Sequence, residues 1–135
     1  MAEWIYDRTG RPQIIVDANR FLDRSGNKTM GWIEGAGTFT LAGQHAGWFE
    51  NGVLSDLRNQ WAGFTADAAA EIPSRPEIIQ TRPMPEVVKS PTRPDFQDIP
   101  TQPEKSGDFS TVPLDYFFDE KIPLAPSFYE DIQGA

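Results

Sequence analysis

Residues 47–59 read GWFENGVLSDLRN, and this stretch contains the features that decide the fold. A Gly-Trp pair opens a short apolar strand, which ends at Asn51-Gly52, the dipeptide most typical of a tight β-hairpin turn. A second short strand ends at Asp56, three residues before Asn59. Asp accepts backbone hydrogen bonds at the start of a turn, and Asn tolerates a positive φ. The stretch therefore predicts two short strands and two tight turns.

The same pattern recurs four times in the first half of the chain. The turn residues Gly10, Gly26, Gly43 and Asn59 lie at intervals of 16, 17 and 16, and the residues three places before them are Asp7, Asp23, Thr40 and Asp56. Downstream of each turn comes one large apolar residue per unit: Val16, Trp32, Trp48 and Phe64. A single hairpin cannot bury an apolar face alone. We therefore expect an all-β fold of four hairpin repeats of about 16 residues in a pseudo-fourfold arrangement around an axis, with these apolar residues in a shared core.

These units resemble the bacterial 4-fold beta flower domain family. The resemblance is carried by YDxxG at residues 6–10, GWIE at 31–34 and GWFENG at 47–52, and it covers about residues 4–64, without the tail. It implies four small hairpins with internal pseudo-fourfold symmetry. It implies no established activity, so no catalytic residue is transferred from the family.

Two other repeat families share part of the pattern. Residues 6–11, YDRTGR, resemble one YD (Rhs-type) repeat, although that wording occurs once. Residues 47–52 resemble choline-binding cell-wall repeats, but Val53-Leu54 follow where those repeats carry paired aromatics. Both families remain alternatives at this point.

Composition divides the chain into residues 1–72, a four-repeat β domain with a short terminal helical turn, and residues 73–135, an acidic, proline-rich tail. Eleven of the 12 prolines lie at or after Pro73, and nine of the 11 glycines lie at or before Gly63. Residues 71–135 carry six basic and twelve acidic residues and supply most of the net charge of −8. Frequent prolines oppose both helix and central strand, so we expect the tail to be extended.

The far end of the tail is unusually aromatic for a proline-rich linker. Aromatic anchors with acidic neighbours are typical of segments that order on a partner protein. The predicted partner-binding residues are Phe109, Tyr116, Phe117, Phe118, Phe128 and Tyr129. Two alternatives remain: the tail folds back onto the β domain, or it is disordered.

No residue set predicts catalysis, a metal or a cofactor. The absence of cysteine excludes thiolate chemistry, and one histidine, His45, offers neither a zinc site nor a dyad, so we expect it on the surface. Asp7, Asp23 and Asp56 occupy equivalent places that could form a cation ring, but each is what an Asp-x-x-Gly turn requires. Glu34 and Glu50 are also equivalent, and we expect both to be solvated.

The sequence thus predicts a non-enzymatic structural or adaptor subunit, whose β module and tail dock onto protein partners of a larger assembly. The alternative is a module that binds a small ligand or a carbohydrate through exposed tryptophans, with the tail as a tether. The acidic charge disfavours nucleic acid. No signal peptide or apolar span is seen, so we expect no membrane insertion and a place in the cytoplasm, in a virion or in another assembly.

Overall fold

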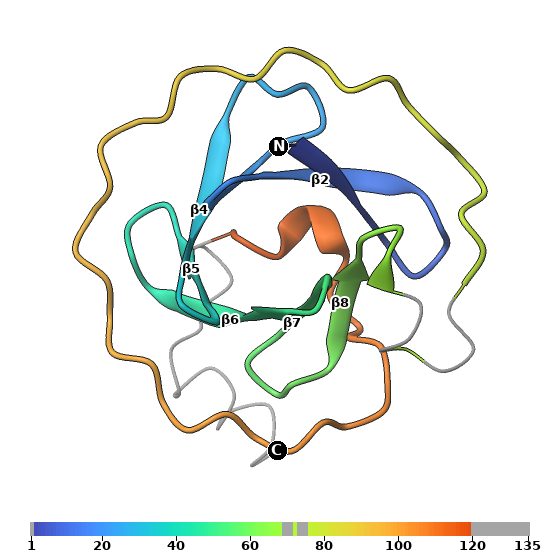
Figure 1. The fold of residues 1–135 in the computed structure, drawn as a ribbon. Coiled ribbons are helices and arrows are strands. Elements are labelled where there is room, and N and C mark those ends of the chain that lie inside the picture. Colours follow the sequence, from blue (N-terminus) through green and yellow to red (C-terminus); the bar gives the residue numbers. More distant parts are fainter. Residues whose placement is uncertain (1, 69–71, 73–75, 120–135) are drawn as a thin grey trace.

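A closed antiparallel barrel forms the centre of the molecule (Figure 1). The computed structural model describes residues 2–68, 72 and 76–119. Each strand pairs with the next, and β8 returns to β1 at the pair Tyr6–Phe64. The strands are β1 (Ala2–Tyr6), β2 (Pro12–Asp17), β3 (Arg20–Leu22), β4 (Thr29–Glu34), β5 (Gly37–Thr40), β6 (His45–Glu50), β7 (Val53–Ser55) and β8 (Trp61–Phe64). The all-β prediction with four hairpins is confirmed.

The register of the strands shows the fourfold repeat directly. A β-bulge interrupts each hairpin at the same place, directly before the residue that precedes the Asp or Thr of the turn: Ile5/Tyr6, Phe21/Leu22, Thr38/Phe39 and Leu54/Ser55. Each turn is then closed by the same backbone hydrogen bond, as from Gly10 N–H to Asp7 O at 2.9 Å. The fourth turn residue has a positive φ in every unit, including Asn59 at 58°.

The inside of the barrel is filled by the residue that precedes each bulge. These four residues are fully buried: Ile5, Phe21, Thr38 and Leu54. Around them lies an inner core that also contains Ile14, Val16, Ala46 and Ala62. Because side chains alternate along a strand, the residue after each bulge faces the outside of the barrel.

Trp32, Trp48 and Phe64 lie on this outer side, because each pairs with a residue that follows a bulge. This corrects the prediction that they share one core inside the ring of hairpins. Phe64 belongs to an outer core together with Tyr6, its cross-strand partner. In the first unit this outer position is held by Ile15 and not by Val16. Ile5 pairs with Ile14 in the same way as Phe21 pairs with Gly31, so the residues that follow, Ile15 and Trp32, are equivalent. The second unit carries one extra residue after Gly26, so a spacing of 16 does not apply across it.

The tail is not a separate extended segment where the structure describes it. Residues 76–112, here called the belt, encircle the barrel as the yellow and orange trace in Figure 1. Belt amides donate hydrogen bonds to the carbonyls of the four turn residues: Ile79 to Gly10 (3.0 Å), Val88 to Gly26 (2.9 Å), Gln97 to Gly43 (2.9 Å) and Ser106 to Asn59 (3.4 Å). Of the alternatives left open for the tail, folding back onto the barrel is the one observed for residues 76–119.

Residues 113–119, here called the plug, close one end of the barrel with the short 3₁₀ helix η2 (Leu114–Tyr116). In Figure 1 this segment lies inside the ring of strands. The glycines that directly precede Trp32, Trp48 and Phe64 make room for it. A Cβ at Gly31 would collide with the ring of Phe118, and one at Gly63 would lie 3.0 Å from Leu114 Cδ2. The plug therefore completes the inner core, as the belt completes the outer one.

Candidate functional site

Of the four predicted partner-binding aromatics that the structure describes, three pack against the chain's own core. Phe118 is 6% exposed and packs on Phe21, with ring centroids 4.8 Å apart. Phe109 packs edge-on against Trp61 at 5.3 Å, and Phe117 is partly buried against the inner core. Phe128 and Tyr129 lie outside the described residues.

Tyr116 differs from its neighbours in the plug, since 51% of its surface is exposed. It lines a cavity of about 690 Å³, here called the end groove, at the plugged end of the barrel. Leu41, in the turn between β5 and β6, is 42% exposed and lines the same groove with Met30 of β4. The remaining lining residues are Lys28, Thr29, Ala42, Asp115, Phe118 and Asp119. The partner-binding role of Tyr116 stays a prediction, and the groove gives it a surface.

The repeated aspartates hold the turns, as expected. Asp56 Oδ1 accepts hydrogen bonds from the amides of Arg58 and Gln60, both at 2.9 Å. Where Thr40 replaces Asp, its hydroxyl accepts from the amide of Gln44 at 3.2 Å. In the part of the chain that the structure describes, no three His, Cys, Asp or Glu side chains gather in a metal-binding arrangement.

The Asp7 carboxylate accepts four hydrogen bonds. Partial burial alone would raise its pKa, but hydrogen bonds from the Thr9 and Gln13 side chains and from the amides of Arg11 and Thr9 hold the pKa below its usual value. A carboxylate that is stabilised in its charged form by its own turn suits a structural role.

The prediction that His45 lies on the surface is wrong. The side chain is 5% exposed, and its ring lies between Phe39 and Trp48, at 5.6 and 4.8 Å. The reason is the belt, because Gln97 covers this position and its Oε1 accepts a hydrogen bond from the His45 amide at 2.8 Å. Nε2 is buried and has no hydrogen-bond partner among the described residues. Burial lowers the pKa of the imidazole, and a backbone hydrogen bond with Gly47 offsets part of this shift.

Trp32 and Trp48 offer no open platform for a sugar ring. Trp32 is fully buried, and Trp48 is 4% exposed. The guanidinium of Arg93 lies 5.3 Å from the Trp32 ring centroid, so the belt covers the face on which a sugar would stack. The alternative of carbohydrate binding through exposed tryptophans loses its surface here.

One pattern that the sequence analysis missed places the belt on the barrel. A proline followed by an acidic residue recurs every nine residues: Pro76-Glu77, Pro85-Glu86, Pro94-Asp95 and Pro103-Glu104. The acidic residue's carbonyl lies close to a turn residue, as Glu86 O does to Gly26. The amide two places later makes the hydrogen bond to the turn carbonyl. The Pro-acidic pair occurs four times at nine-residue spacing, once for each hairpin, and from this the belt could have been predicted.

In a comparison with known proteins, one family model matches the barrel together with the belt. The family described as 4-fold beta flower protein matches residues 3–118, which extends well beyond residues 4–64 and ends at Phe118 in the plug. No curated protein and no solved structure matches the chain significantly. None of the helices that the structure describes has the length and hydrophobicity to cross a membrane. With most of its length matched and a closed fourfold barrel of hairpins, the chain belongs to the 4-fold beta flower family.

Proposed function

We propose that the chain is a non-enzymatic adaptor subunit that docks onto a protein partner of a larger assembly through the end groove. The observation that carries the proposal is the groove itself, about 690 Å³ in volume, with the exposed side chains of Tyr116 and Leu41 on its wall. Aromatic anchors that sit in or beside apolar pockets dominate the energetics of protein interfaces. An apolar surface of this kind on a small domain is typical of an interaction site.

The fold gives this surface a rigid support. Tyr116 is the last residue of η2, and its amide donates to Pro113 O at 3.0 Å. On both sides of it the plug is anchored in the inner core, through Leu114 and Phe118. A preformed surface loses little conformational entropy on binding. The docking surface is therefore a fixed end of the barrel, whereas the sequence suggested a mobile tail.

Charge suggests the chemistry of the partner. The chain carries a net charge of −8, and Asp115 and Asp119 stand beside the apolar residues of the groove. Complementary charge raises association rates and orients partners. The proposed partner therefore presents an apolar side chain among basic residues. Residence in the cytoplasm or in a larger particle is part of the same proposal.

The test uses the full chain with a photo-reactive residue in place of Tyr116, and compares it with the same residue in place of Ile79. Ile79 is 57% exposed but lies on the belt, away from the groove lining, so it is the matched control. In the host cell, position 116 should give a defined protein adduct that Leu41→Asp abolishes and that position 79 does not give. Equal adducts at both positions, or adducts at 116 that survive Leu41→Asp, would refute docking through the groove. An adduct between two copies of the chain would mean that the partner is a second copy of the chain.

A further inference from the structure

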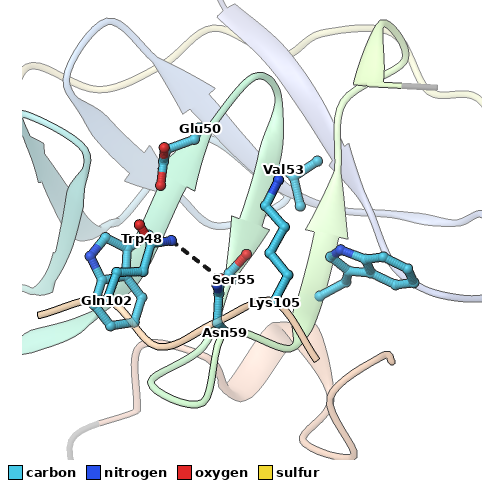
Figure 2. Close-up of a pocket in the computed structure, with 8 residues that line it drawn as sticks. Trp48, Glu50, Val53, Ser55, Asn59, Gln102 and Lys105 are labelled. Carbon is cyan, nitrogen blue, oxygen red and sulfur yellow. Dashed lines mark hydrogen bonds between the residues drawn. The ribbon is translucent and has the colours of Figure 1, made fainter. Parts of the chain in front are cut away.

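The belt leaves little space along the side of the barrel, whereas the plug leaves a groove at its end. Figure 2 shows the side at β6 and β7, where the Gln102 amide of the belt donates a hydrogen bond to Asn59 Oδ1 at 3.3 Å. The pocket that remains there encloses about 20 Å³, the space of about one water molecule. The end groove is about 690 Å³ in volume, within the range of about 300–1,000 Å³ that is typical of ligand sites. An occupant of the end groove therefore has to bring several side chains.

The wall of the end groove is apolar at a position where the chain's own repeats carry charge. Leu41 follows Thr40 in its turn as Arg8 and Arg24 follow the aspartates of the first two turns. Leu41 is 42% exposed, and it lines the groove with Tyr116, which is 51% exposed. Exposed apolar surface costs free energy unless something covers it. The exchange of Arg for Leu in this turn therefore indicates a covered surface.

The chain itself continues from the wall of this groove. Asp119 lines the groove and is the last residue that the structure describes. The 16 residues after it, 120–135, are here called the terminal segment. An extended chain advances about 3.3 Å per residue, so Phe128 can reach any point within roughly 30 Å of Asp119. The family match ends at Phe118, so the terminal segment lies beyond the shared fold.

The terminal segment has the composition of the tail residues that pack on the barrel. Its large apolar residues are Ile122, Leu124, Phe128, Tyr129 and Ile132. Earlier in the tail, such side chains cover the barrel one after another. Phe96 of the belt lies on Phe39 with ring centroids 4.6 Å apart, and Phe118 of the plug lies on Phe21 at 4.8 Å. The end groove is the next apolar surface that the chain meets.

We propose that the terminal segment covers the end groove in the free chain, with Phe128 and Tyr129 against Leu41 and Tyr116, and that a partner has to displace it. A short tether gives the segment an effective concentration on the order of 1 mM. A segment that binds with a Kd of about 0.1 mM then occupies the groove in about nine of ten molecules. Occupancy of this size weakens the apparent affinity for a partner about tenfold. The competition rests on the proposed function of the groove, whereas the occupancy does not.

Charge makes the terminal segment an occupant that a partner can displace. The segment carries three acidic residues and one lysine, a formal charge of −2, and the groove lining carries Asp115 and Asp119 against Lys28, a formal charge of −1. Like charges therefore oppose the apolar contact, and the tether holds the segment in place. A basic partner has both the apolar and the electrostatic contribution in its favour.

The methionines of the full chain allow the occupancy to be measured without a partner. Met30 lines the groove, and Met84, which is 37% exposed on the belt, is the matched control. With ¹³C in the methionine methyl groups, the double change Phe128→Ala and Tyr129→Ala should shift the Met30 signal, because an aromatic ring shifts the resonance of a methyl group beside it. The Met84 signal should stay in place. An unmoved Met30 signal, or equal shifts of both signals, would overturn the proposal.

A photo-reactive residue in place of Phe128 identifies the surface that the segment contacts. It should form an adduct within the same molecule, at Met30, Leu41 or Tyr116, with a yield that does not depend on protein concentration. Leu41→Asp should remove most of this adduct. Adducts at other surfaces of the barrel, or between two molecules, would contradict the assignment. Thermal melts should show the same midpoint for the chain with and without the Phe128→Ala and Tyr129→Ala changes, because neither residue belongs to the barrel cores.

The competition is tested separately, with the photo-reactive residue at position 116 in the host cell. The changes Phe128→Ala and Tyr129→Ala should raise the yield of the partner adduct by up to about tenfold. An unchanged yield would refute the competition and leave docking through the groove intact. An absence of partner adducts in both chains would refute docking and the competition with it, while the Met30 signal alone decides the occupancy.

Discussion

Replacing Gly26 with Ala tests whether the belt is an integral part of the fold. Gly26 has a φ of +74°, and a Cβ there would lie 2.6 Å from the carbonyl oxygen of Glu86 in the belt. Gly35 is the matched control, because its φ is +62° and a Cβ there meets nothing within 4 Å. Both substitutions pay for a left-handed Ala, which costs about 1–2 kcal/mol. They differ in the collision with the belt.

That difference can be worked out from the contacts. The collision forces residues 86–88 away from the turn, which breaks the hydrogen bond of 2.9 Å from Val88 N–H to Gly26 O. Such a bond contributes about 0.5–1.5 kcal/mol net. Partial exposure of Val87, which packs on the outer core, adds up to about 1.5 kcal/mol. We therefore expect Gly26→Ala to lower the free energy of unfolding by about 0.5–3 kcal/mol more than Gly35→Ala does.

Urea unfolding of both variants, followed by tryptophan fluorescence, measures this difference. A lower midpoint with an unchanged slope is expected, since the strands and the plug remain in place. Equal losses of stability in the two variants would mean that the belt does not press on the turn, and the concentric arrangement of barrel and belt would then be wrong.

Three further predictions concern the plug, the buried histidine and the belt as a whole. Phe118→Ala should lower the free energy of unfolding, measured by urea titration, by about 3–5 kcal/mol, because it leaves a cavity in the inner core. Tyr116→Ala should change this free energy by about 0.5 kcal/mol or less, because the side chain is exposed. Equal effects of the two substitutions would contradict the distinction between a buried plug residue and an exposed groove residue. His45 has a pKa below 6.5 in the folded state, so the unfolded chain binds a proton first as the pH falls. Stability should then decrease below about pH 6.5, and His45→Gln should remove that part of the pH dependence in thermal melts; an unchanged profile would contradict the buried, neutral imidazole. A chain that ends at Ile72 should show red-shifted tryptophan fluorescence and no cooperative melt, because the belt covers Trp4 and Trp32; a blue-shifted, cooperative fragment would show that the barrel is complete without it.

The hairpin repeat was predictable because its signals are local. Asp7 and Gly10 are in the same turn, and the Asp-x-x-Gly spacing alone specifies which amide each carboxylate accepts from. The closed order of eight strands followed from four such units, since hairpins that neighbour one another in sequence pair in space. The pseudo-fourfold arrangement therefore needed no long-range information.

The direction of the large side chains was not predictable in the same way. Trp32 was expected in a core shared by the four units. It is indeed buried, but on the outer side of the barrel, where Arg93, some 60 residues further on, covers it. A strand with two apolar faces does not reveal which face is inside. The bulge next to Phe39 decides this, and no local sequence feature marks the bulge.

The burial of Phe117 and Phe118 was not predictable for a related reason. Phe118 among acidic neighbours has the composition of a docking motif, and the same composition serves a segment that docks within its own chain. The cue that distinguishes the two lies far away, in the small residues Gly31, Gly47 and Gly63 that leave space for the plug. The exposed surface at Tyr116, which we propose for a partner, is recognisable only once the packing of the other plug residues is known.

The plug has a consequence for the order of events during translation. Phe118 enters a core whose other walls, Ile5 and Phe21, are made near the start of the chain. A ribosome releases the N-terminal hairpins first, yet their inner and outer cores are finished by belt and plug residues that emerge later. We expect the growing chain to expose apolar surface until residue 118 has left the ribosome. It should then close in a step that is slow for its size, because closure joins segments that are far apart in the sequence, such as those of Phe21 and Phe118. A messenger RNA truncated anywhere in the belt would accordingly yield a fragment with exposed apolar surface, to which chaperones would bind.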